Sequence, residues 1–160
     1  MGQYFGKKVF ERAVESKFED FTLKDVKTHA RVLSVYDGDT CTLGFKWLGK
    51  YFKVKVRMYG YDSPEMRPRK NQENREEEIK AAKLAKEYLI GVTKDQILWA
   101  HFLDFDKYGR PLVTLYLNQY MFCCLGNNKE NINEMMVESG HGYPYKGGTK
   151  KKFVATEKKV

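Results

Sequence analysis

The sequence predicts an α+β fold in which a five-stranded β-barrel carries two or three α-helices. Three observations lead to this prediction. Apolar and polar residues alternate through much of 30–58, with the period of half-buried strands. Two further strand patterns lie at about 96–105 and 110–117. Between the two groups, residues 74–91 repeat apolar side chains with the period of a helix.

The first three strands are expected to form an antiparallel meander. The first strand covers 30–36 and ends at the turn 37–39, Asp-Gly-Asp. The second, at 40–47, and the third, at 51–58, place an apolar residue at every other position. Because successive side chains of a strand point to opposite faces, Arg57 belongs to the polar face of the third strand.

A loop and a helix follow the third strand. Pro64 ends that strand, because proline has no N–H to donate to a neighbouring strand. Asn74 is expected to cap the helix, with Glu77 as the third residue of a capping box. Gly91 is expected to end it. The expected apolar stripe consists of Ala81, Leu84, Ala85 and Tyr88, flanked by Ala82 and Leu89.

The remaining chain predicts a hairpin, an additional strand and a short helix. The last two strands are joined by a hairpin at 106–109, and residues 120–125 prolong the sheet. Asn131 caps a helix that Gly140 ends. This strand order and these attached helices are typical of the oligonucleotide/oligosaccharide-binding (OB) barrel.

Length and composition indicate one intracellular domain. A chain of 160 residues suits a single domain. Residues 1–26 are expected to form an arm with a short helix at about 8–16, and 27–160 the domain with a Lys-rich tail. No apolar run predicts a secretory signal or a membrane span. Three cysteines do not suit a disulfide framework, so we expect a cytoplasmic protein with reduced thiols.

The charge of the chain points to a polyanionic partner. Lys and Arg total 29 against 21 Asp and Glu, which gives a net charge of +8 and a pI near 9.3. Nucleic acid is the commonest partner of such a basic surface. A membrane partner is not expected, although composition alone leaves an anionic membrane or an acidic protein open.

Acidic residues gather in two short, turn-like motifs. Asp37 and Asp39 follow the first strand, whereas Asp62 and Glu65 follow the third. In a meander the ends of these strands lie at the same rim, where the acids can converge on one hard cation. An EF-hand is excluded, because the sequence lacks the glycine and the glutamate required at the sixth and twelfth loop positions.

Two arginines lie beside these motifs or beside the later hairpin. Arg57 is five residues before Asp62, and Arg110 follows the hairpin turn. A guanidinium group presents forked donors that match a phosphate and stays charged at any working pH. The arginines are therefore candidates for binding a phosphate near the acids.

Three motifs carry a family resemblance. They are Tyr-Asp-Gly-Asp-Thr at 36–40, Arg-Met-Tyr-Gly-Tyr-Asp-Ser-Pro-Glu at 57–65 and Asp-Lys-Tyr-Gly-Arg at 106–110. In this order, with a helix between the second and the third, they resemble the staphylococcal nuclease (thermonuclease) family. The resemblance covers about 28–145, and the family has the OB barrel expected here.

The resemblance implies a calcium site. Asp39 and Asp62 match the two ligating carboxylates, and the backbone carbonyl of Ser63 matches the third protein ligand. Asp37 matches an acid that supports the site without binding the ion. Thr40 belongs to the calcium-binding loop.

The resemblance also implies catalytic residues. Arg57 and Arg110 match the pair that grips the scissile phosphate, and Glu65 matches the carboxylate that orients or deprotonates the attacking water. A phosphodiester builds negative charge during cleavage, so a divalent cation and two arginines suit this reaction.

Four further residues are expected to bind substrate. Lys107 and Tyr108 match residues that contact a terminal phosphate of the bound nucleotide. Tyr143 and Tyr145 are candidates for packing on a base, after the second helix.

The function implied is that of a monomeric, Ca²⁺-dependent, sugar-nonspecific nuclease. It would hydrolyse DNA and RNA, with a preference for single strands or frayed duplexes. The alternative is a catalytically silent OB-fold module that binds nucleic acid or protein.

Overall fold

The structure of the protein is a computed structural model that describes residues 21–117 and 130–148. The helix expected at about 8–16, the strand expected at 120–125 and most of the Lys-rich tail lie outside these residues. Within them the chain forms a closed five-stranded barrel with two helices, which confirms the expected α+β OB fold.

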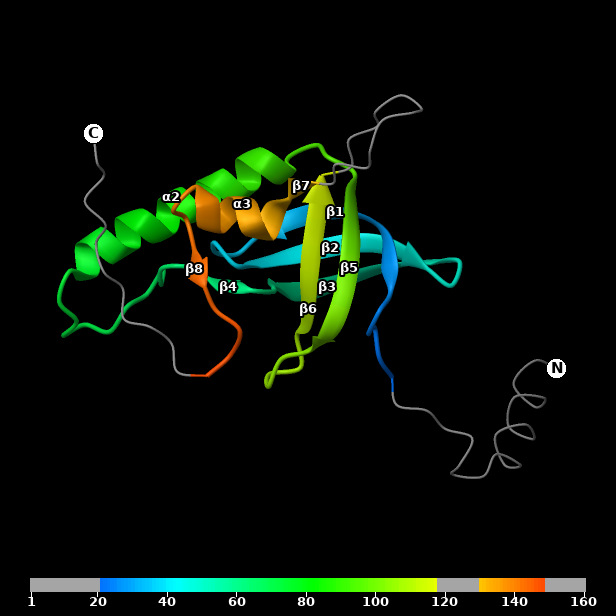
Figure 1. Ribbon diagram of the computed structural model, residues 1–160, viewed down its shortest axis with the longest axis horizontal. Helices are drawn as coiled ribbons and strands as arrows, with labels where there is room; N and C mark the ends of the chain where they lie inside the picture. The colour runs from blue at the N-terminus through cyan, green and yellow to red at the C-terminus, as the bar shows by residue number, and fades with distance from the viewer. Residues whose placement is uncertain (1–20, 118–129, 149–160) are drawn as a thin grey trace.

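The barrel consists of a three-stranded meander and a hairpin (Figure 1). Strand β1 pairs antiparallel with β2 and β5, and the barrel strands lie in the order β3-β2-β1-β5-β6. A parallel pairing of β3 with β6, Arg57 with Leu112 and Met58 with Val113, closes the barrel. The barrel strands are β1 (Lys27–Val35), β2 (Thr40–Trp47), β3 (Lys50–Met58), β5 (Leu98–Phe105) and β6 (Pro111–Leu117).

The alternating apolar residues of the strands fill the barrel. Leu43, Val56 and Phe102 are fully buried, as the strand period requires. Each large side chain moved out of water contributes roughly 1.5–3 kcal/mol to folding. Other barrel residues of the same core are Ala30, Cys41, Phe45, Met58, Leu98, Ala100, Val113 and Leu115.

Three short strands complete the fold of the described residues. Strand β4 (Tyr61–Asp62) pairs antiparallel with β8 (Tyr143–Pro144), which joins the segment after β3 to the segment after the last helix. Strand β7 (Glu130–Asn131) pairs with the end of β6. The β4–β8 pair thus brings residues 61–62 together with residues far along the chain.

Helix α2 (Arg75–Thr93) begins after Asn74, as expected, but it lacks the expected side-chain cap and extends beyond Gly91. Asn74 precedes it with a left-handed φ of 57°, and its side chain forms no capping hydrogen bond. The usual capping residue is extended, so the expected capping box with Glu77 is wrong. The helix also continues through Gly91, because one glycine costs only about 1 kcal/mol. It ends two residues later, where the Thr93 hydroxyl donates to the Leu89 carbonyl at 2.6 Å.

The buried face of α2 is rotated from the expected stripe. Its buried residues are Glu78, Ala82, Ala85, Leu89 and Thr93, whereas Leu84 is 48% exposed. The buried set has helical spacing but begins and ends on polar residues. The apolar residues alone therefore indicate a stripe of the helix that is rotated from the face that is buried.

Helix α3 (Ile132–Glu138) begins and ends as expected. The Asn131 side chain accepts a hydrogen bond from the Asn133 N–H at 3.0 Å, and Gly140 follows the helix with a φ of 76°. The buried Asn133 amide donates to the carbonyls of Tyr59 and Val113 at 2.8 and 3.0 Å. It thereby fixes the helix to β6 and to the segment that follows β3.

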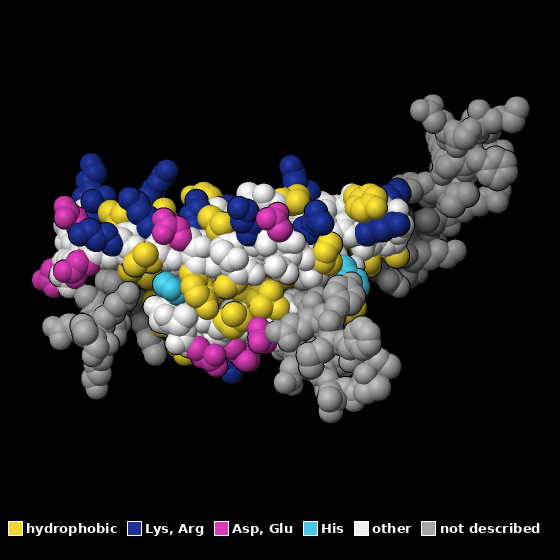
Figure 2. Space-filling view, turned by 90° about the horizontal axis from the view of Figure 1, so that it is seen from above, with side chains coloured by type: hydrophobic (Ala, Val, Ile, Leu, Met, Phe, Trp, Pro, Cys, Tyr) yellow, Lys and Arg dark blue, Asp and Glu magenta, His cyan; other side chains and the backbone are white. Residues whose placement is uncertain are grey.

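The two helices lie side by side against the barrel (Figure 1). Part of the surface is basic. Figure 2 shows Lys and Arg side chains in a row along one long edge of the molecule. Among the described residues, no helix combines the length and the apolar character needed to cross a membrane.

Cys41 provides a test of the closed barrel. Its thiol is fully buried, and burial, with Asp37 and Asp39 adding to it, raises its pKa from 9.0 to about 12. Above pH 9 the unfolded chain loses this proton while the folded chain keeps it. The free energy of unfolding should therefore fall as pH rises from 9 to 12, by up to about 1.4 kcal/mol per pH unit. In urea unfolding, the free energy of unfolding of Cys41→Ala should depend less on pH than that of wild type. The same pH dependence in both proteins would contradict a sealed barrel.

Candidate functional site

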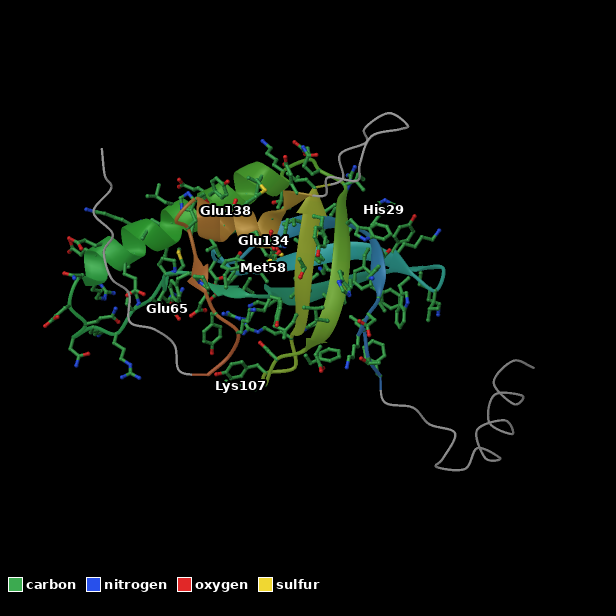
Figure 3. All side chains as sticks on the ribbon, in the orientation of Figure 1. His29, Met58, Glu65, Lys107, Glu134 and Glu138 are labelled. Atoms are coloured by element: carbon green, nitrogen blue, oxygen red, sulfur yellow. The ribbon has the colours of Figure 1, made fainter. Side chains whose placement is uncertain are left out.

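A cleft of about 670 Å³ lies where β3 ends, beside the turn between β5 and β6. Four segments line it: the turn after β1, the chain from Arg57 to Glu65, the β5–β6 turn and residues 145–148. Figure 3 shows Glu65 and Lys107 at this end of the barrel. Eleven of the predicted site residues line the cleft: Asp37, Asp39, Thr40, Arg57, Asp62, Ser63, Glu65, Lys107, Tyr108, Arg110 and Tyr145.

The turn after β1 is fixed by close contacts. The Tyr61 hydroxyl donates to the Gly38 carbonyl at 2.7 Å. A Cβ at Gly38 would lie 2.7 Å from the Ser63 Cβ and 2.8 Å from the Ala85 Cβ, so only glycine fits there. The Asp39 N–H donates to the side chain of Asp37 at 3.2 Å. These contacts hold the turn against the segment after β3.

Asp39 and Asp62 share one guanidinium group. They are only 4% and 3% exposed. Arg57 Nη1 forms an ion pair with Asp39 Oδ1 at 2.9 Å, and Arg57 Nη2 donates to Asp62 Oδ1. Because both carboxylates contact the same planar group, the structure brings together the acids that the two motifs predicted.

Further donors hold the two carboxylates in place. Thr40 Oγ1 donates to Asp39 Oδ1 at 2.8 Å, and the Ser63 N–H donates to Asp39 Oδ2 at 3.2 Å. Tyr143 does not line the cleft, but its hydroxyl donates to Asp62 Oδ2 at 3.0 Å. Tyr143, expected from the sequence as a candidate for packing on a base, thus contacts a carboxylate of the cluster.

The electrostatics of this cluster are dominated by burial. Burial raises the pKa of Asp39 to about 7; Arg57 opposes the increase, whereas Asp37 adds to it. Burial alone would lower the pKa of Arg57, but Asp39 and Asp62 raise it above its ordinary value. Burial, with Asp62 adding to it, also raises the pKa of Tyr143. Burial thus disfavours the charged form of Asp39 even with Arg57 beside it.

The donor set suits a hard cation. Calcium takes carboxylate and carbonyl oxygens in flexible geometry. The carboxylates of Asp39 and Asp62 and the backbone of Ser63 meet at one place, and Asp39 is a buried carboxylate whose charge is poorly stabilised. Within residues 21–117 and 130–148, no group of three or more His, Cys, Asp and Glu residues is placed to hold a metal. Any ion would therefore depend on two carboxylates supplemented by backbone oxygen and water.

Arg110 approaches the cluster from the β5–β6 turn. Its Nε and Nη2 both lie 2.7 Å from Asp106 Oδ2, and its Nη1 lies 3.5 Å from Thr40 Oγ1. Asp106 also accepts from the N–H groups of Tyr108 and Arg110. Although burial opposes it, these hydrogen bonds lower the pKa of Asp106. Thr40 thus contacts both Asp39 and Arg110, which places the two guanidinium groups at one cleft.

Glu65 is exposed at the cleft and is positioned by a residue that sequence analysis missed. Its backbone N–H donates to Glu78 Oε1 at 3.0 Å, and Gln72 donates to Glu78 Oε2. Glu78 is only 3% exposed. The signal for its role was its helical spacing from Ala82 on the buried face.

Asp106 was also missed as a site residue. It belongs to the third motif, and its spacing of four residues from Arg110 was the available signal. The exposed side chains of this turn are Lys107 and Tyr108, the latter 72% exposed. Across the cleft, the Tyr145 ring centroid lies 6.0 Å from Arg57 Cζ. The cleft therefore offers aromatic surfaces beside both arginines.

Comparison with known protein families supports the family resemblance that the three motifs carry. The model of the staphylococcal nuclease homologue family matches residues 55–159. None of the curated proteins compared with the chain matches it. The matched span contains the second and third motifs, whereas the acidic turn at 37–39 precedes it. Because the match covers more than half of the chain, the protein belongs to the staphylococcal nuclease homologue family, whose domains are nuclease-type or nucleic-acid-binding modules.

Proposed function

We propose that the protein is a Ca²⁺-dependent, sugar-nonspecific nuclease that hydrolyses phosphodiester bonds of DNA and RNA as a monomer. One observation carries this proposal: two guanidinium groups, two buried carboxylates and an exposed glutamate line the same cleft. A module that only binds nucleic acid has no need for buried carboxylates beside its phosphate-binding arginines, because they repel phosphate.

Asp39, Asp62 and the carbonyl of Ser63 would hold the calcium ion. When bound, the ion would polarise a phosphoryl oxygen and neutralise charge that develops on it. The chain itself orients these ligands through Thr40 and Tyr143, which donate to the two carboxylates. Asp37 would support the turn through its contact with the backbone N–H of Asp39.

Arg57 and Arg110 would hold the phosphate. Each guanidinium group presents parallel donors to the non-bridging oxygens, where negative charge grows as water adds to phosphorus. Both arginines are fixed by a carboxylate partner, Arg57 by Asp39 and Arg110 by Asp106. Such preorganised donors lower the barrier because they need little rearrangement when the charge develops.

Glu65 would act on the attacking water. The water oxygen forms a bond to phosphorus, its proton passes to the Glu65 carboxylate, and the ester bond to the leaving oxygen breaks. The leaving oxygen then takes a proton from solvent. Glu78, which fixes the backbone of Glu65, is a positioning residue in this scheme.

Replacing Glu65 by glutamine should separate chemistry from binding. Glu65→Gln should lower kcat by about 10²–10⁴ and leave KM within about twofold, because the amide cannot accept the proton but keeps the shape. Steady-state cleavage of a labelled oligonucleotide measures both constants. Glu87→Gln removes a comparable charge from the exposed part of α2 and should leave both unchanged. Equal kcat for Glu65→Gln and wild type would exclude the assigned role.

Contacts to phosphate explain the expected tolerance for sugar and base. Lys107 and Tyr108 would contact a terminal phosphate, and the ring of Tyr145 beside Arg57 offers a surface for an unpaired base. Stacking requires a base that has left the duplex, so single strands and frayed ends should be cut first. Binding should weaken steeply with salt.

Digestion of plasmid and of RNA tests the proposal. Each substrate is incubated with the protein in calcium or in excess chelator, and the products are separated on gels. Degradation of both substrates in calcium, with protection by chelator, is expected. A gel shift without degradation under either condition would reject the nuclease and favour a silent binding module.

A further inference from the structure

Charge is divided unequally between the meander and the rest of the chain. Strands β1, β2 and β3 contain seven Lys and Arg residues and no Asp or Glu. The other residues contain 22 Lys and Arg against 21 Asp and Glu. Almost all of the net charge of +8 therefore lies on three neighbouring strands. These are the strands that lead to the cleft.

The outward-facing side chains of β3 form a line that ends in the cleft. Tyr51, Lys53, Lys55 and Arg57 alternate with inward-facing residues such as Val56, which is fully buried. Tyr51 is 84% exposed, and the two lysines are also exposed. Successive members lie about 7 Å apart along the strand. Strand β3 runs from its hairpin with β2 to the start of β4 (Figure 1), so the line leads away from the catalytic cleft.

The lysines of this line are not neutralised by their neighbours. The residues opposite them on β2 are Thr42 for Lys55 and Gly44 for Lys53. Within the part of the chain that the structure describes, neither lysine forms an ion pair with an acidic side chain. Their charge is available to an anion.

Aromatic rings lie among these lysines. The Lys55 ammonium lies 4.1 Å from the ring centroid of Tyr36, which is 58% exposed and follows β1 beside the acidic turn. The Lys46 ammonium lies 5.6 Å from the ring centroid of Tyr51, its cross-strand partner. Alternating cations and exposed rings are what a surface for unpaired bases requires, since the cations contact phosphates and the rings stack on bases.

We propose that this surface, the β3 ladder of Tyr36, Lys46, Tyr51, Lys53 and Lys55, binds the single-stranded nucleic acid that extends from the cleft. The inference rests on the proposed function, because Arg57 joins the ladder to the scissile phosphate. A duplex would offer its phosphates but not its bases, so the exposed rings favour a single strand. The ladder would raise affinity for long substrates and leave a dinucleotide unaffected.

The lysines are tested by binding without cleavage. Lys53→Gln/Lys55→Gln is compared with wild type by fluorescence anisotropy of a labelled 15-nucleotide single strand in chelator. We expect about tenfold weaker binding at moderate salt, and a dependence of log K on log salt that is smaller by about 1.4 for two lost phosphate contacts. The control pair Lys80→Gln/Lys83→Gln removes the same charge from exposed positions on α2. It should weaken binding less than twofold and leave the salt slope unchanged.

The ring is tested separately from the charge. Tyr51→Ala should weaken single-strand binding by about tenfold, whereas Tyr51→Phe, which keeps the ring, should bind like wild type. Both variants should bind a 15-base-pair duplex with the affinity of wild type. Circular dichroism verifies that each variant is folded.

The outcomes separate the ladder from the nuclease. If the ladder lysine pair and the α2 pair give equal affinities and salt slopes, or if Tyr51→Ala binds like wild type, the ladder proposal is wrong. It is also wrong if the ladder lysines control only binding to phosphatidylserine vesicles. If the ladder variants lose affinity as expected but wild type cuts no substrate in calcium, the proposed nuclease fails and the ladder stands.

Discussion

Replacing Arg57 by alanine is expected to abolish most phosphodiester cleavage and to lower the free energy of unfolding by about 3–5 kcal/mol. The catalytic loss should reach about 10²–10³ in kcat, because one preorganised donor group of the phosphate site is removed. The stability loss has a different origin. Arg57 is the cation that contacts both Asp39 and Asp62, and these carboxylates are almost completely buried. Without it, two buried charges are left close together.

A second substitution should separate these two effects. In Arg57→Ala/Asp39→Asn one of the two carboxylates is neutral, so much of the lost stability should return while cleavage stays absent. Urea unfolding and single-turnover cleavage of one labelled oligonucleotide measure the two properties on the same samples. If Arg57→Ala unfolds at the same urea concentration as wild type, Arg57 does not stabilise the buried carboxylates of Asp39 and Asp62.

Replacing Arg110 by alanine is expected to reduce kcat by a similar factor of about 10²–10³ with a stability change below about 1 kcal/mol. The side chains of Arg110 and Asp106 are 27% and 12% exposed, so their ion pair is partly solvated. Asp106 also keeps the hydrogen bond from the N–H of Tyr108 when the guanidinium is removed. Little folding free energy should therefore depend on Arg110.

The conservative variant tests the forked geometry at Arg110. Arg110→Lys keeps the charge but loses the parallel donors, so its kcat should lie between those of wild type and Arg110→Ala. Arg67→Ala removes an arginine from the exposed loop before α2 and should leave kcat unchanged. A loss in Arg67→Ala equal to that in Arg110→Ala would mean that both act through general charge rather than through one phosphate.

The strands were predictable because apolar and polar residues alternate along a strand that is buried on one face only. Strands β2 and β5 follow this pattern closely, whereas the register of β1 shifts between Val32 and Ser34. The closure of the barrel was not visible locally, because the parallel pairing of Arg57 with Leu112 joins segments 55 residues apart. The buried face of helix α2 includes the predicted Ala82, Ala85 and Leu89 but is rotated from the predicted stripe, for a related reason. Its buried face includes Glu78, whose burial depends on its contacts with Glu65 and Gln72 in the preceding loop.

The site was predictable as a set of motifs and less so as a set of contacts. Asp39, Asp62 and Arg110 could be identified because each occurs in a short motif with fixed spacing, and the cleft collects all three. The position of Tyr143 on Asp62 depends on the pairing of β4 with β8, which joins residues 81 positions apart. No short sequence pattern predicts a contact between residues so far apart in the chain.

The central claim is that one phosphate is held between Arg57 and Arg110 beside Asp39 and Asp62. A crystal structure with calcium and a short oligonucleotide that carries a non-hydrolysable linkage tests it most directly. We expect that linkage within hydrogen-bond distance of both guanidinium groups, with calcium on Asp39, Asp62 and the Ser63 carbonyl. An oligonucleotide bound outside the cleft, or a linkage touching neither arginine while Arg57 still spans the two aspartates, would contradict the account.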